Sequence, residues 1–591
     1  MEIFQRSKEP TGKNSLVIAE MFRALLPAQI LATATSSLSG VVNGLLIGNY
    51  LPQAGMVAMG FVAPVTTLLG ALSGVITGGA RVLCGRAMGE GNAEKINSIF
   101  TLSVLLLTLI GAALTYVGYR FCVPLAGILG AQGELVDATA QYIRGFALGI
   151  IPTLLTPCFM VFLQMGNAST YSLMGAVVLA AASLGLGLLN LEVLRGGVFG
   201  MGLSVSLAQV VSMVFLILRF VIDKNMMHFR LRGLPVGLAG SIVVIGFPTT
   251  LAIILYSLRN TMLNGVGLYF GGADGVAALA ILNSVGGFID AFVAGIGAVV
   301  IMLASVYIGV KDEKSLEALG SYVLRFGLIL NGIKIAILIF IAKPIAILFG
   351  SAGAQVSITS NLLIIYSFSA IPNAFLQVEM STHVCAGRVR MVSIIYLFGC
   401  IIIPISLAYG LGFLFGLNGA WLCYVLTDVL VVLILRVIAW KKNGHFPMRM
   451  HDLLWLPQNL EDNLSISLRT VEEARTAAQR ASEFCLSHGV DEKRSSHCGL
   501  CVEELSVNVV EHGFTKTRRG RRSVDIFLCV TDGEVQLRMC DNAPRFDPHS
   551  KPIAFDPENP TKNLGLRVVA GLAKDLSYQA TFGMNVVTIV L

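Results

Sequence analysis

The sequence predicts an all-α polytopic membrane protein of about twelve transmembrane helices in two six-helix lobes, followed by a C-terminal α/β sandwich domain. Two observations predict this fold class. The 591 residues are 55% hydrophobic and only 13% charged, whereas soluble domains are about one-quarter charged. Apolar runs of about 20 residues, long enough to cross a bilayer, recur up to Trp440, and none follows His445.

The apolar runs define the expected transmembrane spans. Each run, with its flanks, can cross a hydrocarbon core of about 30 Å at a rise of about 1.5 Å per residue. The polar amino terminus shows no cleavage site for a signal peptide, so the first span is expected to act as an uncleaved anchor. The expected spans are residues 22–48, 57–80, 97–122, 138–164, 171–191, 198–221, 241–270, 276–308, 320–342, 357–384, 391–414 and 417–440.

Lysine and arginine residues gather in every second loop between the spans. Such an excess in short loops marks the cytoplasmic side of a membrane, so both termini are expected in the cytoplasm of a multi-pass plasma-membrane protein. This distribution also accounts for the net charge of +7 without a nucleic-acid partner. The basic side carries Arg6, Lys8, Lys13, Arg81, Arg86, Lys95, Arg219, Lys224, Arg230, Arg232, Lys311, Lys314, Arg388, Arg390, Lys441 and Lys442.

The two halves of the membrane part repeat one another. The segment that begins at Pro124 aligns with the segment that begins at Pro344, an offset of 220 residues, and Pro152 then falls on Pro372. Each copy contains six spans, and an even number gives both copies the same orientation in the membrane. The lobes are therefore expected to be related by an axis along the membrane normal, with a cavity between them. This arrangement favours alternating access, and duplication for packing alone is the alternative.

The expected organisation follows from these spans and from the change in composition after them. Six segments are expected along the chain. They are a cytoplasmic N-terminus (1–20), an N-lobe with spans 1 to 6 (21–222), a cytoplasmic linker (223–240), a C-lobe with spans 7 to 12 (241–440), a second linker (441–460) and a soluble domain (461–591).

Several motifs of the membrane part occur in a recognisable order. They include VVNGLLIGNYL in span 1, RVLCGRAMGEGN after span 2 and FLQMGNAST after span 4. With these motifs and the duplication, the chain resembles the MATE family of multidrug and toxin extrusion transporters over nearly all of residues 15–440. The resemblance implies export of amphipathic, often cationic compounds by alternating access, driven by Na⁺ or H⁺.

Charged side chains within the spans are functional candidates, because a charge at the bilayer centre costs about 2.5 to 3.5 kcal/mol. Asp290 in span 8 and Glu379 in span 10 are carboxylates suited to holding a coupling ion. The competing interpretation is that Glu379 forms a structural ion pair with Arg259 of span 7. The charged candidates are Arg259, Asp290, Lys334, Glu379 and Asp428.

The family resemblance adds further ion-coupling candidates. It places carboxylates in spans 7 and 10 of Na⁺-coupled relatives, and Glu379 lies in a fitting span. At the span-7 position this chain has Tyr256, with Arg259 one turn later. Proton-coupled relatives have an aspartate in span 1, where this chain has Asn43. These departures leave both Na⁺ and H⁺ open as the coupling ion.

The soluble part predicts an α/β sandwich, an antiparallel or mixed sheet that carries helices on one face. Helices are expected over residues 472–488 and 493–512, and a short helix from near Leu564. Strands alternate with them, and a hairpin turn is expected at Thr531 to Gly533. The expected strands are ISL from Ile466, SVDIFLCV from Ser523, EVQLRMC from Glu534, LSYQA from Leu576 and NVVTIVL from Asn585.

Glu504, Asn508 and His512 are spaced by four residues and therefore share one face of the second helix. A solvated face is the simplest interpretation of this stripe taken alone. The motifs EELSVNVVEHGF, DNAPRFDP, NLGLRVVAGLA and GMNVVTIVL, however, occur in the order of the GHKL ATP-binding fold. The domain resembles the anti-sigma-factor serine kinase branch of that fold.

This second resemblance implies a Mg-ATP site. Asn508 would hold Mg²⁺, Glu504 would act as general base or orient water, and Asp541 would bind the adenine amino group. Glycine at position 565 would permit close approach to the phosphates. The expected site residues are Glu504, Asn508, His512, Asp541, Ala543, Gly565 and Leu566.

Two features of the soluble domain leave alternatives open. Ala543 and Arg545 replace two glycines that are usual in the family, so a degenerate domain kept for docking to a partner is the alternative to a live site. Cys498 and Cys501, with His497, resemble half of a metal site. Zinc needs about four ligands, so reduced, packed cysteines are expected.

The predicted function is secondary efflux with a cytoplasmic ATP-binding domain that regulates the transporter or signals from it. ATP-driven transport is disfavoured, because the chain has no Walker A motif. The expected partners are an amphipathic small molecule, membrane lipid, and a regulatory protein or a second copy of the soluble domain. The alternatives are a membrane-anchored serine/threonine kinase or sensor that detects ligand through the transporter half, and a lipid flippase.

Overall fold

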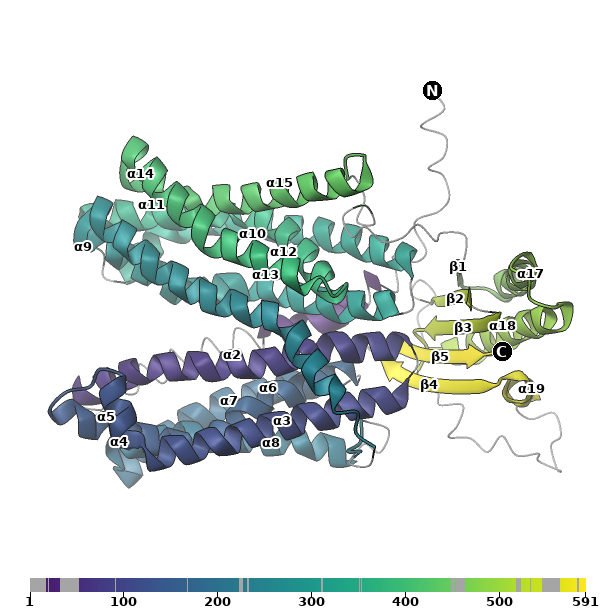
Figure 1. The fold of residues 1–591 in the computed structure, drawn as a ribbon, viewed down its shortest axis with the longest axis horizontal. Helices are drawn as coiled ribbons and strands as arrows, with labels where there is room; N and C mark the ends of the chain where they lie inside the picture. The colour runs from purple at the N-terminus through teal and green to yellow at the C-terminus, as the bar shows by residue number, and fades with distance from the viewer. Residues whose placement is uncertain are drawn as a thin grey trace.

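The computed structural model shows an elongated molecule, with a helical membrane body and a small sheet domain at one end (Figure 1). We call the end that carries the sheet the domain end and the opposite end the far end. The structure describes residues 18–19, 21–31, 53–90, 92–166, 168–222, 227–230, 233–309, 312–349, 351, 353–447, 452, 463–516, 522–531, 533–544, 564–581 and 584–591.

Within these residues, nine helices are long and apolar enough to cross a membrane, or eleven when each of two bent helix pairs counts as one span. The eleven follow predicted spans 2 to 12 in order. Of predicted span 1, only the short apolar helix Met21–Leu31 is described. The helices of the body are α2 (Gln53–Gly89), α3 (Ala93–Arg120), α4 (Cys122–Ile128), α5 (Glu134–Ala147), α6 (Ile150–Met165), α7 (Ser169–Leu188), η2 (Leu189–Leu194), α8 (Gly197–Ile222), α9 (Gly237–Gly309), α10 (Glu313–Leu348), α11 (Ala354–Phe368), α12 (Ala370–Cys385), α13 (Val389–Leu397), η3 (Phe398–Ile402), α14 (Ile403–Trp421) and α15 (Cys423–Asn443).

The backbone geometry repeats at the predicted offset. Gly133 and Gly353, which are 220 residues apart, have φ of +58° and +57°. Asn92 and Asp312, at the same offset, cap α3 and α10 by accepting a hydrogen bond from the backbone N–H three residues on. The corresponding spans 4 and 10 are both bent. Their halves are Leu135–Ala147 with Ile150–Met165, at 46°, and Ala354–Phe368 with Ala370–Cys385, at 42°.

The N-lobe (α2 to α8) and the C-lobe (α9 to α15) contact each other along α2 and α9 (Figure 1). A Cβ atom on Gly246 of α9 would lie 1.8 Å from the backbone oxygen of Val75 in α2. A Cβ atom on Gly79 would lie 1.8 Å from that of Ile242. Only glycine permits backbones to approach so closely, as at other helix crossings in membranes.

A second set of lobe contacts lies at the domain end of α2. Arg86 donates from Nε to the backbone oxygen of Cys385 at 3.0 Å. A Cβ atom on Gly85 would lie 1.8 Å from the Ser305 hydroxyl oxygen. The domain-end parts of α2 and α9 therefore hold the two lobes together.

The sheet domain has the predicted α/β sandwich architecture. Its strands have the order β1-β2-β3-β5-β4, and every neighbouring pair is antiparallel. Each predicted helix and strand is present within one residue of its expected bounds, except that β1 begins three residues before the predicted start at Ile466. The elements are β1 (Asn463–Leu468), α17 (Val471–Ser487), α18 (Glu492–Glu511), η5 (Gly513–Lys516), β2 (Val524–Thr531), β3 (Glu534–Asp541), α19 (Leu564–Leu572), β4 (Asp575–Thr581) and β5 (Met584–Val590).

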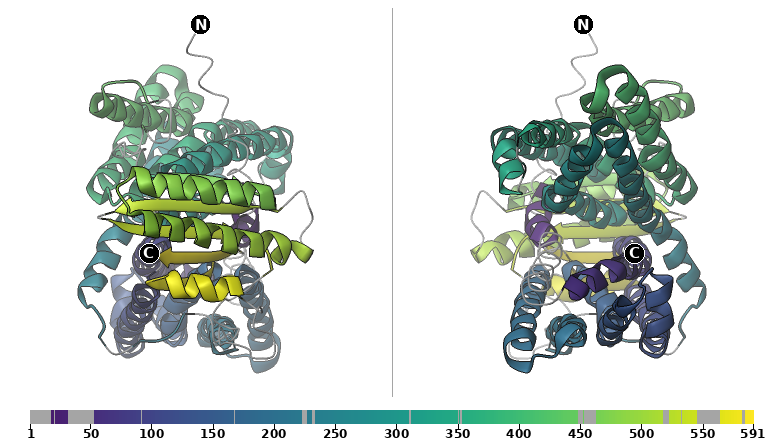
Figure 2. Two further views of the ribbon diagram at one scale, coloured as in Figure 1. Left: turned by 90° about the vertical axis from the view of Figure 1, so that its right-hand side faces the viewer. Right: turned by 90° about the vertical axis from the view of Figure 1, so that its left-hand side faces the viewer.

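The helices α17, α18 and α19 cover one face of this sheet, and the membrane body lies on the other side (Figures 1 and 2). Side-chain oxygens of Thr470 and Asp491 cap α17 and α18 by accepting backbone N–H bonds. Cys498 and Cys501 are free thiols buried in the core between sheet and helices, where Cys485 is also buried. Their position agrees with the packed, reduced cysteines expected from the sequence.

Candidate functional site

A network of polar side chains links several helices of the C-lobe, with Asp290 at an exposed position and Asp428 buried. The Tyr366 hydroxyl, on α11, donates to the Asp290 carboxylate of α9, with oxygen distances of 2.9 and 2.7 Å. Asp428, on α15, is 8% exposed and accepts a hydrogen bond from the Asn373 side-chain amide of α12 at 3.2 Å. Both hydrogen bonds come from neutral donors, so neither neutralises the charge of its carboxylate.

Arg259 brings a positive charge to the same network. Its guanidinium carbon lies 4.3 Å from the ring centroid of Tyr256 and 5.4 Å from that of Tyr424. The Tyr424 and Tyr366 rings pack edge to face in a T-shape, at 5.2 Å between centroids. Aromatic faces attract a cation with about 0.5 to 2 kcal/mol each, and the buried Arg259 Nε has no hydrogen-bond partner among the described residues. Tyrosine faces therefore hold this guanidinium.

The expected ion pair between Glu379 and Arg259 is wrong. Glu379, on α12, is 3% exposed, and its Oε1 lies 2.6 Å from Nη2 of Arg436 on α15. Arg436 also donates from Nη1 to the backbone oxygen of Pro447 at 3.1 Å. Because the tyrosine rings occupy Arg259 and Arg436 is within reach of α12, Glu379 forms a pair that is separate from the Asp290 network.

A small pocket lies beside Asp428 and Tyr256. Its wall is mostly apolar and includes methionine and aromatic side chains, which adapt to flat molecules of varied shape. The lining residues are Tyr256, Leu376, Gln377, Met380, Ile395, Tyr396, Gly399, Cys400, Asp428 and Val431.

Three of the five predicted ion-coupling candidates therefore lie in one lobe network, namely Tyr256, Arg259 and Asp290. Glu379 forms its own pair with Arg436, on the same two helices, α12 and α15, that carry Asn373 and Asp428. Asn43 lies outside the described residues.

The nucleotide candidate Asp541 lies at the end of β3 and is 2% exposed. Its Oδ1 accepts hydrogen bonds from Asn585 Nδ2 at 2.8 Å and from the backbone N–H of Ala543 at 2.9 Å. Asn585, in β5, is itself oriented by the Tyr578 hydroxyl, which donates to its Oδ1 at 2.8 Å. Burial raises the pKa of Asp541 to about 6, although the two hydrogen bonds oppose the rise.

Glu504, Asn508 and His512 follow one face of α18, as their spacing predicts. Glu504 and Asn508 are partly exposed, and His512, the C-terminal cap of α18, is exposed. A Cβ atom on Gly565, at the start of α19, would lie 2.0 Å from Glu504 Oε2. Glycine at this position lets α19 approach the Glu504 carboxylate. Leu566, the next residue, is 8% exposed and packs in the soluble core.

These side chains have the chemistry that Mg-ATP requires. The buried Asp541 carboxylate can accept a hydrogen bond from an adenine amino group, and the Asn508 amide oxygen is a hard ligand of the kind that Mg²⁺ prefers. Glu504 stands one helical turn before Asn508. Arg545 and the rest of the segment between Pro544 and Leu564 lie outside the described residues.

The sequence alone does not single out three residues of these sites. Asn585 lies in a recognised motif, but its contact with Asp541 requires the pairing of β3 with β5. Arg436 stands eight residues after Asp428, about two helical turns along the same face. This spacing places Arg436 on the same side of the helix as a charged candidate, but it does not identify Glu379 as its partner. Asn373 has no sequence signal, because its role depends on the packing of α12 against α15.

The membrane part and the soluble domain each match a known family model. The MatE family model matches residues 28–169 and 248–410, and the model described as histidine kinase-like ATPase domain matches residues 468–591. The chain is 23% identical over 463 residues to the probable multidrug resistance protein YoeA of Bacillus subtilis (strain 168), covering 74% of this chain and 98% of that protein. It is 24% identical over 437 residues to the multidrug export protein MepA of Staphylococcus aureus (strain N315), covering 72% and 94%.

Solved structures share the fold of the membrane body. One is an outward-facing conformation of a multidrug resistance MATE family transporter of the MOP superfamily, with a TM-score of 0.67 and 18% identity over 73% of this chain and 98% of that chain. Another is a MOP superfamily transporter from Pyrococcus furiosus Vc1 (DSM3638), with a TM-score of 0.65 and 18% identity over 73% and 97%.

Proposed function

The chain belongs to the MatE family, whose model matches about half of it, and from this membership we propose that it is a cation-coupled secondary exporter of amphipathic small molecules. The observation that carries the proposal is the network of Asp290, Asp428 and Arg259 beside an apolar cavity. Charges inside a membrane span are costly and are rarely found without a function. The export described by the names of the relatives supports the same substrate class.

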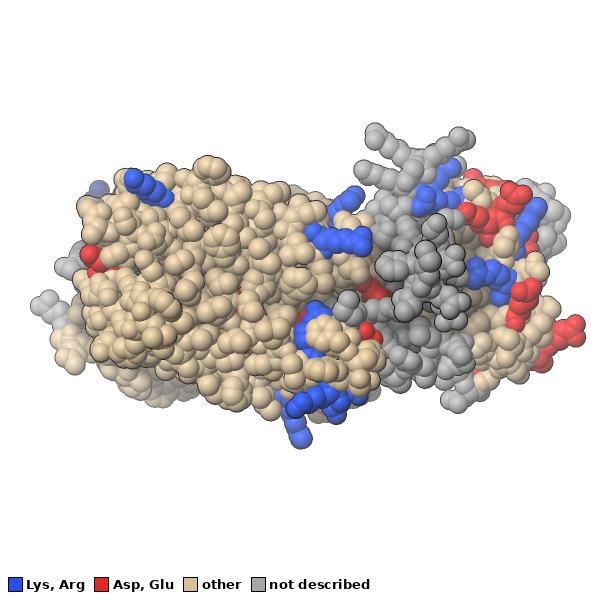
Figure 3. Space-filling view, turned by 90° about the horizontal axis from the view of Figure 1, so that it is seen from above, with Lys and Arg blue, Asp and Glu red and all other residues tan. Residues whose placement is uncertain are grey.

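We propose that the domain end faces the cytoplasm of the plasma membrane. In the face drawn in Figure 3, lysine and arginine side chains gather where the membrane body meets the domain end, and the broad middle of the body is almost free of charge. A basic end marks the cytoplasmic side. A domain that binds ATP also belongs on that side.

With this orientation, the observed conformation is closed to the cytoplasm. The lobes meet at Gly79, Gly246 and Arg86, all in the domain-end parts of α2 and α9. Export by alternating access requires that these contacts separate so that substrate can enter the cavity from the cytoplasm.

The two carboxylates are suited to coupling because their charges are not neutralised by their hydrogen-bond donors. Binding of Na⁺ or H⁺ at Asp290 or Asp428 removes one negative charge from the network around Arg259. A ligand shifts a conformational equilibrium only through a difference in affinity between the two states. An ion that binds the outward-open network more tightly would therefore couple its inward movement to substrate export.

The test is ion-driven export by the full chain in proteoliposomes, with a fluorescent amphipathic cation as substrate. Imposed Na⁺ and H⁺ gradients are compared for the wild type and Asp428→Asn. We expect the variant to lose gradient-driven export by about tenfold or more, because a network charge has been removed. Asp137→Asn, at an exposed position in α5, makes the same change outside the network and should export normally. Equal export by Asp428→Asn and the wild type would remove Asp428 from coupling.

We also propose that the soluble domain binds Mg-ATP as a regulator of the transporter. Asp541 would bind the adenine amino group, and Asn508 would hold Mg²⁺, which neutralises phosphate charge when bound. Glu504 lies on the same helix face, beside Gly565. The match of the whole domain to the histidine kinase-like ATPase model supports this assignment.

Nucleotide binding is tested on the full chain in detergent by equilibrium titration with ATP, with and without Mg²⁺. The Asn508→Ala variant should lose the Mg²⁺-dependent part of the affinity and keep the rest. Arg480→Ala, at an exposed position on α17, is the control. An identical Mg²⁺ response in Asn508→Ala would exclude Asn508 as the ligand.

A further inference from the structure

The outer face of the soluble sheet is covered by the membrane body. Because successive side chains along a strand point to opposite faces, each strand presents one set to the helices and one set to the lobes. In β3, Leu537 and Met539 join the core under α17 and α18, whereas Arg538 and Cys540 face the lobes. Figure 2 shows the sheet lying across the ends of both lobes, behind its own helical layer.

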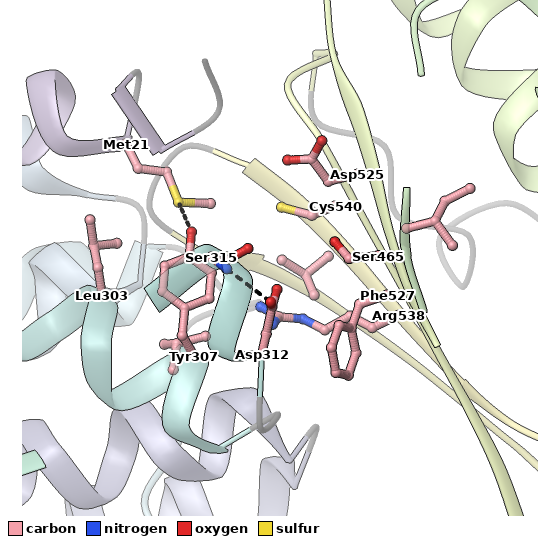
Figure 4. A pocket seen from close by; sticks show the side chains of 13 residues that line it. Met21, Leu303, Tyr307, Asp312, Ser315, Ser465, Asp525, Phe527, Arg538 and Cys540 are labelled. Carbon is pink, nitrogen blue, oxygen red and sulfur yellow. Dashed lines mark hydrogen bonds between the residues drawn. The ribbon is translucent and has the colours of Figure 1, made fainter. Parts of the chain in front are cut away.

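A small pocket marks this contact (Figure 4). Side chains from β1, β2, β3 and β5 line it on one side, and side chains from the first helix, α9 and α10 line it on the other. The lining residues are Met21, Leu303, Val306, Tyr307, Asp312, Ser315, Ser465, Asp525, Ile526, Phe527, Arg538, Cys540 and Val586.

The lobe side of the pocket is built from the first helix and the C-lobe. Met21 lies in the first helix, whereas Tyr307, at the end of α9, and Asp312, at the start of α10, belong to the C-lobe. The rest of the sheet extends across the end of the N-lobe (Figure 2). The Tyr307 hydroxyl lies 3.9 Å from the Met21 sulfur. If the lobes part at the domain end, one rigid sheet can no longer lie across the ends of both.

The contact combines apolar burial with unsatisfied polar groups. Phe527 is 7% exposed and Met584 is 3% exposed, although both lie on strands of the outer face. The Arg538 Nε and Asp525 Oδ1 atoms are buried and have no hydrogen-bond partner among the described residues. Burial, together with the nearby charge of Asp312, raises the pKa of Asp525 to about 7.

Buried polar atoms without partners weaken a contact, because they have lost their hydration without compensation. The Asp525 carboxylate keeps a hydrogen bond with Ser467, so its loss is partial. The apolar groups hold the sheet in place, and the polar groups keep the association modest. A contact of this kind suits an interface between domains that opens and closes. A permanently fused core would satisfy these groups.

We propose that the outer face of the sheet is a latch that docks on the first helix, the end of α9 and the start of α10, holds the two lobes together at the domain end, and must be released for transport. The latch occupies the end that parts in alternating access. The latch is a property beyond the proposed exporter activity. Only the part of its test that measures export rests on that activity.

The test introduces a charge into the docked face of the full chain. Phe527→Arg places a guanidinium in the contact, and Ser465→Arg does so from β1, which guards against a variant that fails to fold. Thr476→Arg adds the same side chain at an exposed position on α17 and is the matched control. ATP binding by each variant verifies that the soluble domain is folded.

Two native thiols report the result through maleimide labelling and peptide mass mapping. Cys540 lines the pocket and reports release of the sheet. Cys385 is fully buried beside Arg86 at the lobe contact and reports opening of the lobes. We expect both latch variants to label about tenfold faster at both thiols, as loss of one buried aromatic contact would produce, and to export substrate faster than the Thr476→Arg control.

Faster labelling of Cys540 with unchanged labelling of Cys385 would overturn the latch, because the sheet would then be released without freeing the lobes. Unchanged labelling of Cys540 in both variants would also overturn it, because the face would carry no docking contact. Absence of export in every variant and in the wild type, with the labelling pattern as expected, would instead refute the proposed exporter and leave the latch intact.

Discussion

Asp541→Asn changes the nucleotide site by the smallest available step. The asparagine keeps the side-chain shape, and its Oδ1 can still accept the bonds from Asn585 and from the Ala543 N–H, at 2.8 and 2.9 Å in the wild type. The fold of the domain should therefore persist. The substitution changes the second terminal atom of the side chain, where the carboxylate oxygen, an acceptor, is replaced by an amide NH₂, a donor.

The size of the effect follows from the charge that is lost. A hydrogen bond to a charged group contributes about 1.5 to 3 kcal/mol, so ATP should bind about tenfold to one-hundred-fold more weakly to the variant. The wild type should also lose ATP affinity in acid. The pKa of Asp541 is about 6 without nucleotide, and adenine requires the carboxylate, so affinity should fall about tenfold per pH unit below pH 6 and be constant above it.

The assay is equilibrium ATP binding to the full chain between pH 5 and pH 8, with inosine triphosphate as a second ligand. Asp541→Asn should lose the part of the pH dependence that the wild type shows near pH 6. It should also discriminate less against inosine triphosphate, because the new amide can donate to the 6-oxo group. Wild-type affinity that does not change between pH 5 and pH 7, or equal ATP affinity in the variant, would refute the assignment of Asp541 to adenine.

Three further substitutions test the lobe contact, the buried ion pair and the approach of α19. Gly246→Ala should separate α2 from α9 and destabilise the closed end by about 1 to 3 kcal/mol, seen as a lower melting temperature and faster thiol labelling at the lobe contact. Glu379→Gln should lower the free energy of unfolding by about 2 kcal/mol, which is less than the loss of a fully buried ion pair, because the Arg436 side chain is 18% exposed. Ion-driven export per folded molecule should persist. Loss of export at unchanged stability would contradict the structural role. Gly565→Ala should change stability by less than about 1 kcal/mol, because only the flexible end of Glu504 must move, but should weaken ATP binding measurably; unchanged binding would show that α19 does not need this close approach.

The predicted helices and strands follow from the spacing of apolar residues and from the positions of glycines, which determine the local backbone conformation. The 220-residue repeat is visible in the sequence and returns as the matched φ of Gly133 and Gly353. The order of strands in the soluble sheet does not follow from local patterns, because β3 pairs with β5 across α19 and β4. For this reason Asp541 is recognisable in the sequence and its partner Asn585 is not.

The partners of buried charges are similarly set by packing between distant helices. Glu379 is identifiable as a charge within a span, but Arg259 and Arg436 are equally plausible partners from the sequence. The choice depends on the faces of Tyr256 and Tyr424, which hold Arg259 at 4.3 and 5.4 Å. No property of one helix alone contains this information.

The soluble sheet brings the proposed nucleotide site and the proposed latch within one residue of each other. Cys540 faces the lobes, and Asp541, next to it in β3, faces the helices and the nucleotide site. If ATP binds the released sheet more tightly than the docked sheet, then release must raise ATP affinity by the same factor, because coupling between two binding equilibria is reciprocal. The ATP dissociation constant of Phe527→Arg, compared with that of Thr476→Arg, therefore measures the coupling directly. A difference would make nucleotide a controller of the latch, and equal constants would mean that the latch opens independently of ATP.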